Sequence, residues 1–118
     1  MAVTSNLKLN LKFSGDVTLD DFFAFAQNAA SPGQAQVLDL SSGNNTITVP
    51  SGGSSAASGV IVIPPSGNAV VLTLKGVAGD TGFAMGLTDP AVLTLGSGVT
   101  SFVINAASAV TGVRLFFL

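Results

Sequence analysis

Short segments in which apolar and polar residues alternate with a period of two recur along this chain. The first is the clearest, because Leu7, Leu9, Leu11 and Phe13 alternate with asparagine and lysine. Successive side chains of a β-strand point to opposite faces, so the alternation predicts a strand with one apolar and one polar face. Residues typical of turns, mainly glycine, proline, serine and asparagine, separate the segments. The pattern therefore predicts an all-β chain.

Counting these segments gives about eight or nine short strands, with turn signals every 8–12 residues or so. After the first strand, they are expected at residues 37–40, 46–49, 60–63, 69–75, 83–87, 91–95, 99–104 and 113–118. This spacing is typical of an antiparallel β-sandwich or a small barrel, and among these we favour a jelly roll. We expect residues 1–118 to form a single domain, because a chain of this length can bury about 65% of its unfolded surface.

Three segments carry more specific expectations. Residues 60–63 are all apolar, which predicts a strand covered on both faces. Residues 41–45 are rich in serine, glycine and asparagine and are expected to form a turn. Residues 51–59 are almost entirely serine, glycine and alanine, which is typical of a flexible loop.

A helical period competes with the period of two only in residues 18–30. Four apolar residues recur there at the spacing of one helix face: Leu19, Phe22, Phe23 and Ala26. A threonine and an aspartate at the start resemble a capping box, and Ser-Pro-Gly at residues 31–33 would end the helix. We therefore predict a short helix near residues 19–29, with a strand through residues 23–25 as the alternative.

Charged residues are scarce, at 8% of the chain, against roughly 25% in a typical soluble domain. Charge normally keeps protein surfaces apart in water, and sheet edges with so little of it promote association unless they are covered. We therefore expect the chain to function assembled with copies of itself.

The missing residue types also exclude most catalytic chemistry. The chain has no histidine, cysteine, glutamate, tryptophan or tyrosine. A Ser-His-Asp triad and a cysteine nucleophile are therefore impossible, and the six aspartates show no spacing typical of an acid–base pair. We expect no enzymatic activity, no metal site and no cofactor.

Nucleic acid and membranes are also unexpected partners. Four basic residues, Lys8, Lys12, Lys75 and Arg114, are too few and too scattered to follow a phosphate backbone. No run of about 18 apolar residues, the length of a membrane-spanning helix, is present. The first six residues also lack the basic and apolar regions of a signal peptide, so we expect synthesis in the cytoplasm.

The glycine-rich segment at residues 76–82 most resembles a ligand-binding loop. Gly79, Asp80 and Thr81 form its centre, and glycines let a backbone expose its N–H groups. The Asp80 carboxylate would then hold a cation or accept a hydrogen bond from a sugar hydroxyl. The alternative is a tight turn in which Asp80 bonds its own backbone.

Two groups of apolar residues are candidates for contacts between subunits. The terminal run has no polar tail, so its side chains must be buried in the sheet or against a neighbour. The amphipathic segment near residue 22 would dock on a partner, or close one end of the sandwich. The residues concerned are Leu7, Leu9, Leu11, Phe13, Phe22, Phe23, Leu115, Phe116, Phe117 and Leu118.

Four stretches of the C-terminal half, at residues 76–83, 89–90, 101–107 and 112–118, together resemble small virion proteins of tailed bacteriophages. The resemblance is one of texture, with strands rich in glycine, serine, alanine, valine and threonine, no cysteine and an apolar last strand. It implies a β-sandwich or jelly-roll subunit, often trimeric, that decorates or cements a capsid or forms a head or tail appendage. It transfers no functional residue, because such families share no catalytic signature.

We therefore expect a non-enzymatic structural protein of a phage virion, made in the host cytoplasm. Its expected form is a homotrimeric capsid decoration or cement subunit that binds the major capsid protein or another virion protein. The alternative is a receptor- or carbohydrate-binding head of a fibre or tail appendage. The lack of tryptophan and tyrosine, the usual sugar-binding side chains, counts against that alternative.

Overall fold

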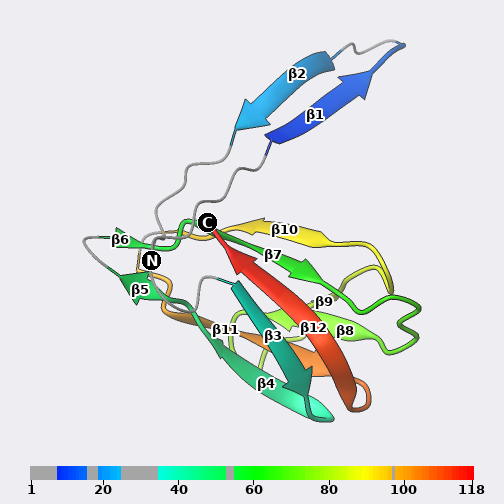
Figure 1. Cartoon of the computed structure of the whole chain (residues 1–118), viewed down its shortest axis with the longest axis vertical. Coiled ribbons are helices and arrows are strands. Elements are labelled where there is room, and N and C mark those ends of the chain that lie inside the picture. Colours follow the sequence, from blue (N-terminus) through cyan, green and yellow to red (C-terminus); the bar gives the residue numbers. More distant parts are fainter. Residues whose placement is uncertain (1–7, 16–18, 25–34, 53–54, 97) are drawn as a thin grey trace.

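The computed structural model describes residues 8–15, 19–24, 35–52, 55–96 and 98–118, and over these ranges the chain is all-β without a helix. Figure 1 shows a two-layered β-sandwich with an additional hairpin standing clear of it. The strands are β1 (Lys8–Phe13), β2 (Leu19–Ala24), β3 (Ala35–Leu40), β4 (Gly43–Thr48), β5 (Ser51–Gly52), β6 (Ser55–Ala56), β7 (Gly59–Ile63), β8 (Leu72–Lys75), β9 (Phe83–Ala84), β10 (Ala91–Thr94), β11 (Ser101–Ala106) and β12 (Val110–Phe117).

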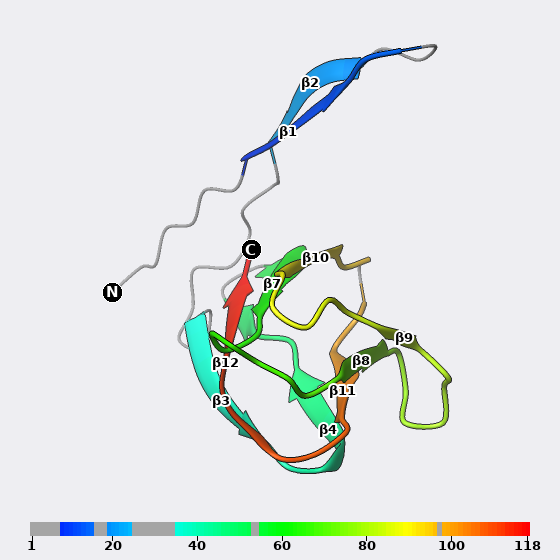
Figure 2. The same ribbon diagram turned by 90° about the vertical axis from the view of Figure 1, so that its right-hand side faces the viewer.

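Two four-stranded antiparallel sheets form the sandwich (Figures 1 and 2). The first sheet has the order β10-β7-β12-β3, and the second has the order β4-β11-β8-β9. Strands β1 and β2 form the separate hairpin, and β5 and β6 form a small hairpin between β4 and β7. The antiparallel β-sandwich predicted from the sequence is confirmed.

The strand pairing in the sandwich is nested. Strand β3 pairs with β12, β4 with β11, β7 with β10, and β8 with β9. The first strand of the sandwich thus pairs with the last, the second with the last but one, and so on inward. Such pairing is that of one long hairpin rolled up so that its two ends lie in one sheet.

The core lies between the two sheets and follows from the period of two. Along β12, Val113, Leu115 and Phe117 are fully buried, while the residues between them point to the other face. Strand β7 adds Val60 and Val62, and the second sheet adds Leu72 and Ile104. Full burial of such a side chain stabilises a fold by roughly 1.5–3 kcal/mol, so these alternating strands supply the main stabilisation of the sandwich.

The end of β12 is fixed to the sandwich by its backbone. The Leu118 N–H donates to the Gly59 carbonyl at 2.9 Å, and the Leu118 carbonyl accepts from the Ser58 N–H at 2.7 Å. The Leu118 side chain is buried. Apart from Phe116, which is half-buried, the terminal apolar run is therefore part of the core of its own chain.

The predicted helix near residues 19–29 is wrong for residues 19–24, which form β2, while residues 25–29 lie outside the described part of the chain. Strand β2 pairs with β1 residue by residue, from Lys8 opposite Ala24 to Phe13 opposite Leu19. The register sets Leu9 opposite Phe23 and Lys12 opposite Asp20, and both kinds of cross-strand pair are favourable. These cross-strand pairs outweigh a weak local helical pattern.

Three smaller expectations also need correction. Residues 43–45 belong to β4, and residues 51–52 and 55–56 form the β5–β6 hairpin, so neither predicted loop is wholly irregular. In β7, Val60 and Val62 are buried, but Ile61 and Ile63 are only half-buried. One face of β7 is thus covered by the second sheet, whereas the other lies on the outside of the sandwich.

Candidate assembly surface

The outer face of the first sheet is apolar. One row of cross-strand neighbours crosses all four strands, from Val92 through Ile61 and Phe116 to Ala35. The next row sets Ile63 and Val37 on either side of Arg114. We call the six apolar residues of these rows the apolar face: Val92, Ile61, Phe116, Ala35, Ile63 and Val37.

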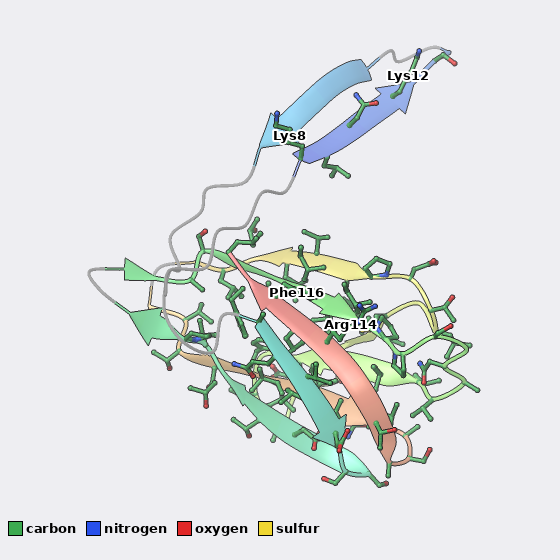
Figure 3. All side chains as sticks on the ribbon, viewed as in Figure 1. Lys8, Lys12, Arg114 and Phe116 are labelled. Carbon is green, nitrogen blue, oxygen red and sulfur yellow. The ribbon has the colours of Figure 1, made fainter. Side chains whose placement is uncertain are left out.

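Several side chains of the apolar face are strongly exposed for their type. The exposed fraction is 71% for Val37 and 42% for Val92, and Ile61, Ile63 and Phe116 are half-buried. Figure 3 labels Phe116 and Arg114 on β12, a central strand of this sheet. A contiguous exposed apolar surface of this kind marks an interaction site in a soluble protein.

Arg114 provides the charge at the centre of this surface. Its side chain is exposed, and no ion pair joins it to a carboxylate among the described residues. Asp39 lies on the same strand as Val37, two residues further along, but its carboxylate accepts the Gly112 N–H at 3.2 Å. Gly112 lies where the register of β12 and β3 shifts, so the Asp39 carboxylate is hydrogen-bonded to the backbone at the end of the sheet.

The outer face of the second sheet is polar by contrast. Thr46, Thr48 and Ser101 are exposed there, and Lys75 is half-buried. The Asn105 Nδ2 donates to Asn44 Oδ1 at 2.8 Å across two strands. This surface has the composition of a sheet face that contacts water.

The register of the β1–β2 hairpin places several apolar residues on one side. Directly opposed residues of an antiparallel pair share a face, and the register therefore places five apolar residues and Asp21 together. These are Leu9, Leu11, Phe13, Leu19 and Phe23, with Asp21 opposite Leu11. The Leu9 side chain is 41% exposed. Among the described elements, the strands of the sandwich do not cover this hairpin, which stands clear of them in Figures 1 and 2.

The structure separates the residues predicted to lie between subunits. Leu115, Phe117 and Leu118 are buried in the core of their own chain, so only Phe116 of the terminal run is available to a second copy. Leu9, Leu11 and Phe13 share one face of the hairpin with Phe23, while Phe22 lies on the opposite face beside Asn10. Leu7 lies outside the described residues.

The loop at residues 76–82 has the bonds of a self-stabilised turn. The Asp80 Oδ2 accepts the N–H groups of Gly76 at 3.1 Å and Val77 at 2.9 Å. Gly79 and Thr81 are exposed beside it. These bonds are those of the turn alternative, and ligand binding by this loop stays a prediction. Within the described ranges, no group of three or more potential metal-ligating residues comes together.

Five of the six residues of the apolar face were not among the sequence candidates: Val37, Ile61, Ile63, Val92 and Ala35. A signal was present for all but Ala35, because each of the other four stands next to another apolar residue within a strand. Two consecutive apolar residues in a strand cannot both face the core. The pairs Val37-Leu38, Val92-Leu93 and Phe116-Phe117 therefore each place one apolar residue outside.

Comparisons with known proteins give no match, whether with family models, curated proteins or solved structures. The functional argument therefore depends on the surfaces described above. Among the described residues, no helix has the length and apolar character required to cross a membrane.

Proposed function

We propose that this chain is a non-enzymatic structural protein of a phage virion, a capsid decoration or cement subunit that acts as a homotrimer. The observation that carries the proposal is the apolar face on one side of the sandwich, in a chain with only 8% charged residues. Such a surface stays soluble only when another surface covers it. Copies of the same chain are the simplest cover.

The strand order supports assigning the sandwich to the jelly rolls. Eight strands pair in a nested sequence and roll into two four-stranded sheets. Jelly rolls of this kind build viral capsid proteins and also lectin domains. The architecture is therefore compatible with the virion subunit and with the binding head considered as the alternative.

The proposed mechanism is stabilisation by mass action. Each subunit buries apolar surface against its own copies, and the assembled trimer binds the major capsid protein or another virion protein. A partner that binds the assembled capsid preferentially stabilises it. A standard interface removes about 800 Å² from each partner, and several such contacts on one lattice increase the overall affinity. The subunit is made in the host cytoplasm and then joins the virion.

Light scattering of the purified protein over a dilution series tests the proposal. We expect a mass three times that of the 11.7 kDa chain, and this mass should persist on dilution. Co-sedimentation with empty capsids then tests the second partner. A monomer at every concentration would contradict the proposal.

The second sheet supports one alternative, a receptor- or carbohydrate-binding head. Its outer face presents hydroxyl and amide groups, among them Thr46, Thr48 and Asn105. Such groups hydrogen-bond to sugar hydroxyls. Binding on a glycan array that disappears in Asp80→Ala or Asn105→Ala would favour this alternative over the capsid subunit.

A further inference from the structure

Two groups of apolar residues lie outside the core between the two sheets. One is the apolar face of the first sheet, and the other is the set of residues that the register places on the Leu9 side of the β1–β2 hairpin, Leu11 and Phe23 among them. A two-stranded hairpin is marginally stable in water by itself and needs a surface to pack on. The hairpin, like the apolar face, therefore needs another surface to pack on.

The two surfaces are complementary in charge. Asp21 is the single charged residue among the six on the hairpin face, and Arg114 is the single charged residue in the two rows of the sheet. Each charge stands among apolar neighbours. A charge covered by apolar groups is costly unless an opposite charge meets it. Asp21 and Arg114 supply that opposite charge to each other.

The other face of the hairpin is mixed in character. Lys8, Asn10 and Lys12 of β1 are exposed on it, and Figure 3 shows both lysines along β1, while the register places Ala24, Phe22 and Asp20 opposite them. With its Leu9 face against the first sheet, the hairpin would present this more polar face outward. It would then form a third layer over a sheet whose outer face is otherwise apolar.

We propose that the β1–β2 hairpin of one copy packs on the apolar face of a second copy, with Asp21 paired to Arg114 of that copy. This inference rests on the proposed function, because it requires a homo-oligomer. The hairpin stands clear of its own first sheet in Figures 1 and 2, so the first sheet is open to the hairpin of another copy. Ten residues separate Ala24 from Ala35, and a segment of that length can span up to roughly 35 Å.

The composition of the hairpin face is compatible with a contact of ordinary size. A phenylalanine alone buries about 150–250 Å², and the hairpin face contains two together with three leucines. A pairwise interface of standard size removes about 800 Å² from each partner. In a closed trimer each copy donates one hairpin and accepts one, so the same contact occurs three times.

Engineered disulfides test the exchange cleanly, because the chain has no cysteine of its own. Asp21→Cys and Arg114→Cys are prepared as separate full-length variants, mixed in equal amounts and oxidised. We expect a disulfide-linked dimer that joins one chain of each variant, identified by mass spectrometry. The double variant Asp21→Cys/Arg114→Cys should give a covalent trimer on non-reducing electrophoresis. Double-variant disulfides confined to single chains would show that the hairpin folds back on its own sheet, and would overturn the inference.

A matched pair controls for random oxidation. Thr46→Cys places the thiol on the exposed outer face of the second sheet, and its mixture with Asp21→Cys should give no linked dimer. Equal yields from the two mixtures would overturn the inference, because the hairpin would then have no preferred surface.

Charge exchange gives a second test without oxidation. Arg114→Asp should weaken association at least about tenfold, and Asp21→Arg/Arg114→Asp should restore the wild-type mass. Lys75→Asp makes the same change on the second sheet and should leave the mass unchanged. If the wild-type chain is oligomeric but shows neither the cross-link nor the charge effect, the exchange is excluded while the proposed function stands. A wild-type monomer would exclude both.

Discussion

The outer faces of the two sheets differ although the same alternation of residues builds both. On the first sheet, Ile61 and Phe116 lie side by side across β7 and β12. On the second, the equivalent outward positions carry threonine, serine and asparagine, and Asn44 accepts a hydrogen bond from Asn105. Folding requires only that the inward residues be apolar. The outward residues are free to vary, so their composition shows which side of the sandwich meets water.

Val103 sharpens this contrast because it is the apolar exception on the second sheet. It lies between Thr46 and Lys75 in the register, yet it is only 4% exposed. Long polar side chains can cover apolar surface with their aliphatic stems. On the first sheet, Val37 lies beside Arg114 in the register, yet it is 71% exposed. The second sheet thus hides its single outward valine, whereas the first presents several apolar residues together.

The largest effect is expected where the two sheets meet. Phe117→Ala removes a fully buried side chain of β12 and should lower the free energy of unfolding by about 3–5 kcal/mol. Denaturant unfolding at a fixed chain concentration measures it. Phe116→Ala, one residue earlier and on the apolar face, is the matched control and should change folding much less. Equal losses would show that the two faces of β12 do not differ as described.

A charge on the apolar face should prevent assembly without unfolding the chain. Phe116→Asp puts a carboxylate in the centre of the row that joins Ile61 to Ala35, and loss of such a central contact weakens association roughly 30-fold or more. Light scattering across dilution measures the mass. Thr46→Asp, on the second sheet, should keep the wild-type mass. A correctly assembled Phe116→Asp protein would contradict the role of this face.

A smaller effect is expected at the turn between β8 and β9. Asp80→Ala removes the acceptor for the Gly76 and Val77 N–H groups, and because the site is exposed we expect a loss of about 1 kcal/mol in stability. Thermal or denaturant unfolding measures this loss, and light scattering should show no change in mass. Asp80→Asn keeps an acceptor and should lose less. A changed mass would show that this loop takes part in the contacts between copies.

The smallest effect is expected on the polar face. Asn105→Ala removes one exposed side-chain hydrogen bond to Asn44 and should cost about 0.5 kcal/mol, with assembly unchanged. Thr48→Ala, exposed on the same face, provides the reference value. If Asn105→Ala dissociates the oligomer, then the second sheet also forms an interface between copies.

The sequence predicted which segments are strands because alternation follows directly from the geometry of a sheet. All eight strands of the sandwich overlap segments expected from the pattern, and so does β1. The order of the strands was not predictable in the same way. Alternation states which side chains of Val110–Phe117 face inward, but not that this strand lies between β7 and β3.

The hairpin shows where local pattern misleads. Leu19, Phe22 and Phe23 fit a helix face as well as a strand, and the distinction depends on pairing with β1, which the apolar period of residues 18–30 does not reveal. The residues of the apolar face were only partly predictable. Phe116 was among the predicted contact residues, but so were Leu115 and Phe117, which alternation turns toward the core.

The nested pairing of the strands has a consequence for timing. Strand β3 pairs with β12, so two segments more than 60 residues apart must meet before the first sheet is complete. Contacts of such long range form slowly, whereas β8 and β9 close a short loop. Strand β12 also lies between β7 and β3 and carries Phe116. The apolar face, which includes Phe116, is therefore complete only once this long-range pairing has formed.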